Sequence, residues 1–128
     1  MMTRNLIYTV GAILILGVLA TSSTGALMNP KRTTYLSFNK PVRLPGVSLA
    51  AGTYRFELPD PDHAWFVVRV SSGDGKRVYL TAFTRLVDRP AGMPLGQSII
   101  FGEGPADAPT PIKSWYPQDE NTGRQFIY

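Results

Sequence analysis

The sequence contains no cysteine and a single histidine, His63. The missing cysteines exclude disulfides, thiol nucleophiles and thiolate metal ligands, and one histidine cannot build a zinc site by itself. His63 follows Asp60-Pro61-Asp62, a run of turn residues, and no Gly-x-Ser-x-Gly motif accompanies it. We therefore expect His63 to be an exposed turn residue and not a catalytic base.

Motifs for phosphate, dinucleotide or calcium binding are also missing. Gly102-Glu103-Gly104 is too short a glycine pattern and precedes no helix. The carboxylate pairs, Asp60 with Asp62 and Asp119 with Glu120, lie within single turns and lack EF-hand spacing. Glycosidases instead need two carboxylates facing each other across a cleft. The sequence therefore predicts a non-enzymatic protein with no catalytic residue, metal or cofactor. The less favoured alternative is an envelope hydrolase, in which Asp60 or Asp62 would face Asp119 or Glu120 across a cleft.

One long hydrophobic run is present, at the N-terminus. Arg4 precedes the apolar stretch Leu6–Ala20, and the small, polar residues Thr21–Ala26 follow it. This is the layout of a secretory signal peptide, with cleavage after Ala26 or Gly25. We predict a helical leader over residues 1–26 and an exported domain over residues 27–128, which is periplasmic or extracellular.

An uncleaved membrane anchor is the alternative for the leader. No charge occurs between Arg4 and Lys31, although the strongly apolar part is shorter than the roughly 20 residues of a spanning helix. Contact with the membrane would then be made only through residues 1–26. Both alternatives place the remaining chain outside the cytoplasm, and the absence of cysteine excludes a lipid anchor.

The positive charge is modest and scattered. The net charge of +4 falls to +3 without Arg4, and the longest basic runs are the pairs Lys31-Arg32 and Lys76-Arg77. For an exported protein, anionic envelope polymers are more plausible partners than nucleic acid. An ordinary mixed surface accounts for the same charge. We predict no nucleic-acid partner.

Beyond the leader, short alternating segments are separated by turn residues, and no helical pattern occurs. In Thr53–Leu58 the residues Tyr54, Phe56 and Leu58 fall on one face, and Pro45-Gly46 fits the centre of a type II turn. The pattern predicts an all-β domain, a single β-sandwich or small barrel of about eight short antiparallel strands. The expected strands are 33–38, 42–49 with its turn, 53–58, 64–70, 77–86, 97–101, 112–116 and 125–128, with an irregular loop at 102–111.

Aromatic residues supply the candidate ligand-binding side chains, Trp65, Trp115 and Tyr116. Trp65 is predicted on the strand face opposite Phe66, and Trp115 and Tyr116 are adjacent, so they point to opposite faces of their strand and one of them is a candidate for facing solvent. Exposed Trp and Tyr rings stack on sugars or anchor protein interfaces. The alternative is that each ring closes one end of the core.

Outward-facing positions of the predicted strands also include several arginines. If their strands are neighbours, they form a basic, partly aromatic face, whereas an ordinary solvated sheet face is the alternative. The residues of this face are Arg55, Arg69, Arg77 and Arg85, with Tyr79 and Phe83.

Two stretches resemble an uncharacterised family of short secreted all-β proteins from soil bacteria. The first is VRLPGVSLAAGTYRF, Val42–Phe56, which is similar to a PGVxLPAGTYxF segment and departs from it at Ala50, where proline is common. The second is the C-terminal WYPQDENTGRQFIY, Trp115–Tyr128. The resemblance covers nearly all of residues 33–128. It implies secretion and an all-β fold, and it transfers no catalytic residue.

These observations predict an exported, non-enzymatic β-domain that binds an envelope glycan or protein. The leader and the scarcity of catalytic groups are the reasons for this prediction. A structural subunit of a membrane or surface assembly, tethered by an uncleaved leader, is the alternative.

Overall fold

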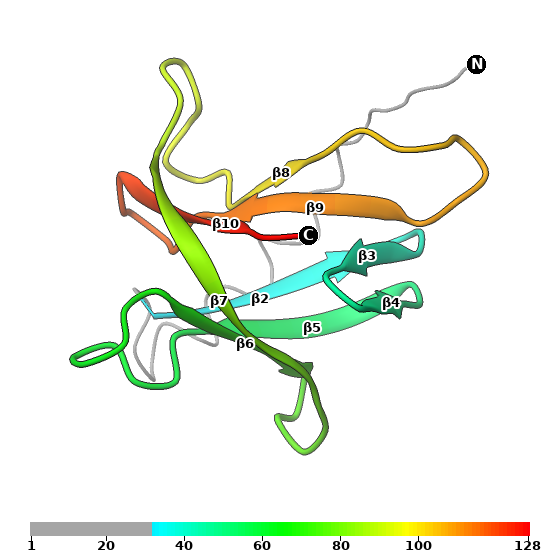
Figure 1. Ribbon diagram of the computed structural model, residues 1–128, viewed down its shortest axis with the longest axis horizontal. Coiled ribbons are helices and arrows are strands. Elements are labelled where there is room, and N and C mark those ends of the chain that lie inside the picture. The colour runs from blue at the N-terminus through cyan, green and yellow to red at the C-terminus, as the bar shows by residue number, and fades with distance from the viewer. Residues whose placement is uncertain (1–31) are drawn as a thin grey trace.

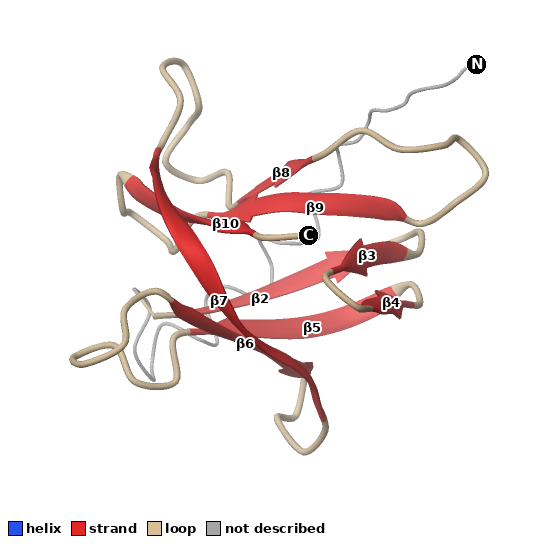
Figure 2. Ribbon diagram, in the orientation of Figure 1, coloured by secondary structure: helices blue, strands red, loops and turns tan. Residues whose placement is uncertain are grey.

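A computed structural model describes residues 32–128 of the chain. Regular structure in this part consists of β-strands (Figure 2), and the described residues include no helix long and apolar enough to cross a membrane. The leader predicted for residues 1–26 lies outside the described residues. The strands are β2 (Thr33–Phe38), β3 (Val42–Leu44), β4 (Val47–Leu49), β5 (Gly52–Glu57), β6 (Val67–Ser72), β7 (Val78–Asp88), β8 (Ile99–Phe101), β9 (Thr110–Trp115) and β10 (Thr122–Phe126).

The strands form one open nine-stranded sheet in the order β2-β5-β6-β7-β10-β9-β3-β4, with β8 added to β9. The all-β prediction is confirmed. The pairing does not divide into the two sheets of a sandwich, and its ends at β2 and β4 leave it open where a barrel would close. The pairing is also not wholly antiparallel, because Val42 and Arg43 of β3 pair in parallel with Thr110 and Pro111 of β9.

The long strand β7 bends the sheet over its own core. Its first part, up to Phe83, pairs with β6, and its second part, from Thr84, pairs with β10. In Figure 1 it runs diagonally between the layer of β2, β5 and β6 and the layer of β8, β9 and β10. The Phe56 ring of β5 packs at 6.0 Å from the Trp115 ring of β9 and at 6.5 Å from the Phe126 ring of β10. A single sheet therefore covers the core from both sides.

Alternation of apolar residues explains the inner face of each strand. Tyr54, Phe56 and Leu58 are buried as predicted, and so are Val68 and Val70 of β6. The turn between β3 and β4 also follows the prediction, because Gly46 adopts a φ of 75°, as the second central position of a type II turn requires.

The observed strand boundaries differ from the predicted ones at two places, before β6 and at the start of β9. Between Asp60 and Val67 the backbone turns, with Ala64 N donating to Asp60 O at 2.8 Å and Val67 N donating to Ala64 O at 3.1 Å. Strand β6 therefore starts at Val67 and not at Ala64, and Trp65 and Phe66 lie in the preceding turn. Strand β9 begins at Thr110, inside the segment predicted to be irregular.

Candidate binding surface

The outward-facing side chains of β5, β6 and β7 lie on one continuous surface, which we call the outer face. In the antiparallel register Glu57 pairs with Arg69, Arg69 with Thr81, and Val67 with Phe83. Paired residues point to the same side of a sheet, and the intervening residues Val68 and Val70 are buried. Arg69 and Phe83 are thus diagonal neighbours on the outer face.

Three rings at one end of the outer face form an exposed aromatic patch, namely Trp65, Phe66 and Phe83. Phe83 is 70% exposed and Trp65 is 49% exposed. The rings of Phe66 and Phe83 stack with their centroids 5.8 Å apart, and those of Trp65 and Phe66 meet edge to face at 5.1 Å. Trp65 is therefore the sequence-predicted ligand-binding candidate that reaches solvent.

A cavity of about 300 Å³, which we call the arginine cavity, opens beside Arg69. Strand β2, strand β5 and the turn after β5 form its walls, and Arg69 of β6 completes it. The lining residues are Arg32, Thr33, Tyr35, Arg55, Glu57, Leu58, Pro59, Pro61 and Arg69.

Glu57 holds two of these arginines in place. One carboxylate oxygen, Oε1, accepts hydrogen bonds from Arg55 Nε at 3.2 Å and Arg55 Nη2 at 2.9 Å. The other, Oε2, lies 3.5 Å from Arg69 Nη1. Glu57 is 12% exposed, whereas Arg55 and Arg69 are 32% and 40% exposed. The carboxylate is thus mostly covered by two guanidinium groups that reach solvent.

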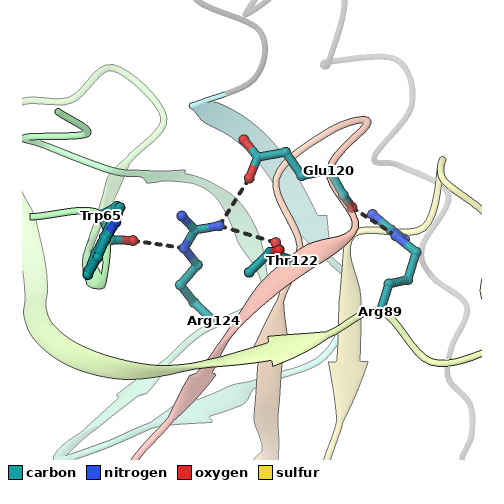
Figure 3. A network of polar contacts seen from close by, with 5 residues as sticks. All are labelled: Trp65, Arg89, Glu120, Thr122 and Arg124. Atoms are coloured by element: carbon teal, nitrogen blue, oxygen red, sulfur yellow. Dashed lines mark hydrogen bonds and ion pairs between the residues drawn. The ribbon is translucent and has the colours of Figure 1, made fainter.

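A buried arginine on β10 fixes the backbone of the aromatic patch. Arg124 is 5% exposed, and its Nε donates to the Trp65 carbonyl oxygen at 2.9 Å. Its Nη1 donates to Glu120 Oε1 and to the Thr122 carbonyl oxygen, each at 3.1 Å. Figure 3 shows these contacts, with Arg89 Nε donating to the Glu120 carbonyl oxygen at 3.0 Å. The turn that carries Trp65 is therefore tied to the loop between β9 and β10.

Trp115 and Tyr116, the other two sequence-predicted candidates, are buried at 0% and 2% exposure. Neither ring faces solvent, and the alternative that both belong to the core holds, because this end of β9 does not alternate between buried and exposed: Ser114, Trp115 and Tyr116 are consecutive and all buried. Tyr116 N donates to the Ser98 carbonyl oxygen at 2.7 Å, and the Arg89 guanidinium covers the ring at 5.1 Å. Burial lowers the pKa of Arg89.

The predicted basic face is only partly assembled. Arg55, Arg69 and Phe83 do share the outer face, because β5, β6 and β7 are neighbours. Tyr79 instead packs against the core, with its ring 5.6 Å from that of Tyr54, and Arg77 lies over the Tyr79 ring at 5.3 Å. The exposed Arg85 belongs to the part of β7 that pairs with β10.

The acidic turns have basic partners of their own. Asp60 Oδ1 lies 3.1 Å from His63 Nδ1, Asp62 lies 3.5 Å from Arg32, and Glu120 pairs with Arg124. His63 is exposed, as the sequence predicts. Within residues 32–128 no group of three or more His, Asp or Glu side chains is placed to hold a metal ion.

Arg124 and Phe66 are the parts of this surface that the sequence analysis missed. Arg124 has the same strand parity as the core residue Phe126, and an inward-facing arginine needs a buried partner. That parity was a usable signal. Phe66 was expected on the strand face opposite Trp65, but the turn before β6 places its ring against both Trp65 and Phe83. No family model, curated protein or solved structure matches this chain, so its function is inferred from the geometry of this surface.

Proposed function

We propose that this protein is an exported, non-enzymatic domain that binds a component of the cell envelope through the aromatic patch. The main support is the exposure of the aromatic patch, in which Phe83 is 70% exposed and Trp65 is 49% exposed. Polar side chains are the usual occupants of such solvent-facing positions. Clusters of exposed aromatic rings on soluble proteins mark binding sites. The leader supports the envelope as the location.

The backbone of the aromatic patch is also held in place by hydrogen bonds, as expected of a binding site. The Trp65 carbonyl is held by Arg124, and the Phe66 carbonyl oxygen accepts hydrogen bonds from Thr84 N at 2.9 Å and Thr84 Oγ1 at 2.6 Å. A rigid aromatic platform loses little conformational entropy when a ligand settles on it. Flat rings of this kind suit the apolar face of a sugar or an aromatic anchor of a protein.

The resemblance to secreted proteins of soil bacteria stays a prediction and agrees with this proposal. The first stretch, Val42–Phe56, builds β3, β4 and β5, and the second, Trp115–Tyr128, builds β10 and the core around Trp115. Both stretches shape the fold, while the aromatic patch lies between them in sequence. We therefore propose that members of such a family share the fold and need not share the ligand.

The proposal is tested by retention of the protein on insoluble cell-wall polysaccharide and on whole envelope fractions. The protein is isolated from the cells that make it, with detergent if it stays membrane-bound. We expect Trp65→Ala and Phe83→Ala each to weaken retention roughly tenfold or more, as hot-spot truncations do. Leu95→Ala is the matched control, because Leu95 is also 49% exposed but lies outside the patch. Equal retention of all three variants would overturn the assignment of the patch.

A further inference from the structure

The arginine cavity carries uncompensated positive charge. Its lining contains Arg32, Arg55 and Arg69 against Glu57, and Asp62 approaches Arg32 from the rim at 3.5 Å. Three positive charges therefore face two negative charges and the balance is +1. The Asp62 side chain is 72% exposed, where solvent screens its pair with Arg32 strongly. A concave site lined by one sign of charge concentrates counter-ions.

The guanidinium groups keep donors for a ligand. A guanidinium has five N–H donors, and Glu57 engages Arg55 through Nε and Nη2 and approaches Arg69 only at Nη1. The Glu57 carboxylate therefore orients both guanidinium groups without using all their donors. Planar, oriented guanidinium groups bind carboxylate and phosphate in two-pronged hydrogen bonds.

The cavity adjoins the aromatic patch. Arg69 and Phe83 are diagonal neighbours across β6 and β7, a relation that places their Cα atoms roughly 7–8 Å apart. Val67 lies between them as the direct partner of Phe83. One extended ligand can therefore place an apolar ring face on Phe83 and an acidic group against Arg69 at the same time.

We propose that the outer face binds an acidic glycan, with sugar rings on the aromatic patch and a carboxylate or phosphate group in the arginine cavity. This inference rests on the proposed function and adds the ligand class. The combination of stacked rings and oriented arginines excludes a purely neutral polymer as the preferred ligand, because it would leave the charge of the cavity without a partner.

The test compares three immobilised probes with the full protein, namely polygalacturonate, its fully methyl-esterified form and a phosphomannan. We expect binding to at least one acidic polymer that is roughly tenfold or more tighter than binding to the neutral ester. Binding to polygalacturonate assigns the cavity to uronic acids, and binding to phosphomannan assigns it to phosphate. Added salt should weaken acidic binding more than neutral binding.

Arg69→Gln and Arg55→Gln isolate the cavity, and Arg77→Gln is the control, since Arg77 stacks on Tyr79 away from the cavity lining. We expect each cavity variant to lose the preference for the acidic polymer while it keeps the weak binding to the ester. Phe83→Ala should lose both. A thermal melt confirms that each variant is folded.

The outcomes separate this inference from the proposed function. Equal binding of acidic and neutral polymers, unchanged in Arg69→Gln and abolished in Phe83→Ala, would overturn the anionic ligand and keep the patch as a binding site. Binding of none of the polymers would overturn the acidic glycan, and unchanged envelope retention of Phe83→Ala would overturn the proposed function as well.

Discussion

Gly123 lies so close to the Tyr116 ring that a Cβ atom has no room there. The ring cannot yield easily, because Tyr116 is 2% exposed, Ser114 Oγ donates to its hydroxyl at 3.2 Å, and the Arg89 guanidinium lies over the ring. A glycine at this register position is thus a requirement of packing and not of backbone conformation.

We expect Gly123→Ala to lower the free energy of unfolding by about 1–3 kcal/mol, the usual cost of overpacking. The measurement is urea unfolding followed by tryptophan emission, to which the buried Trp115 contributes. Gly96→Ala is the control, since no atom lies within 4 Å of its added methyl group. If both variants unfold at the same urea concentration, the packing argument fails.

Tyr128 predicts how stability changes at alkaline pH. Its hydroxyl lies 2.6 Å from the Ile112 carbonyl oxygen and 2.9 Å from the Arg43 carbonyl oxygen, so the two acceptors share its single proton. Although the residue as a whole is 55% exposed, desolvation of the hydroxyl raises the pKa of Tyr128 from 10.0 to about 12. The folded state therefore holds the phenolic proton more tightly than the unfolded state. The resulting stabilisation is fully present below pH 10 and is lost as the pH rises through 12.

Tyr128→Phe removes this titration together with the hydrogen bonds. We expect it to cost about 1–2 kcal/mol at pH 8 and to flatten the fall in stability between pH 10 and pH 12. Burial also raises the pKa of Tyr54, but Tyr54 is present in both proteins, so the difference between their unfolding curves reports Tyr128. Parallel curves over that pH range would contradict the prediction.

At the scale of elements, Arg124 connects β10, the loop before it and the turn that carries Trp65. Arg124→Met should keep most of the side-chain volume while it removes hydrogen bonds to Trp65, Glu120 and Thr122. We expect a loss of about 2–3 kcal/mol in unfolding free energy, because hydrogen bonds from a charged donor contribute more than neutral ones.

The same variant should loosen the aromatic patch before the protein unfolds. Acrylamide quenching of Trp65 emission, measured in a Trp115→Phe background, should increase under native conditions. Arg85→Met is the control, since Arg85 is an exposed arginine on the neighbouring strand. Unchanged quenching with a large loss of stability would mean that Arg124 supports the core but not the patch.

Local alternation was enough to predict most strands but not their ends. The predicted strand 33–38 coincides with β2, and the burial of Tyr54, Phe56 and Leu58 was predicted correctly. Alternation failed for Phe66 and Tyr116, both just outside a strand, where hydrogen bonds of turns replace the ladder. Candidate residues next to strand ends were therefore the least predictable, and two of the three candidates were buried.

Pairing over the whole molecule was beyond the reach of the sequence. The parallel contact of β3 with β9 joins residues 42–43 to residues 110–111, and no local pattern distinguishes this from an antiparallel partner. The division of β7 between β6 and β10 likewise depends on long-range packing. The arginine cavity follows from this topology, because Arg32, Arg55 and Arg69 meet only when β2, β5 and β6 are neighbours.

The last prediction concerns the leader predicted for residues 1–26. Arg32 belongs to the folded domain, because its carbonyl oxygen accepts a hydrogen bond from Leu58 N at 3.0 Å and its side chain pairs with Asp62. A cut after Ala26 or Gly25, at the end of the small, polar stretch Thr21–Ala26, would leave Arg32 in the mature chain. We expect the intact mass of the protein isolated from its producing cells to match a chain that begins at Leu27 or Ala26.

Replacing the small residues before the expected cut tests the same point. Thr24→Tyr combined with Gly25→Tyr and Ala26→Tyr should block both expected cuts, because signal peptidase requires a small residue directly before the cleavage site, and the protein should then remain in the membrane fraction at its full mass. Thr24→Ser is the matched control and should be processed normally. A full-length mass for the unaltered protein, together with its extraction only by detergent, would show that the leader is an anchor and would favour the tethered structural subunit over a released binding domain.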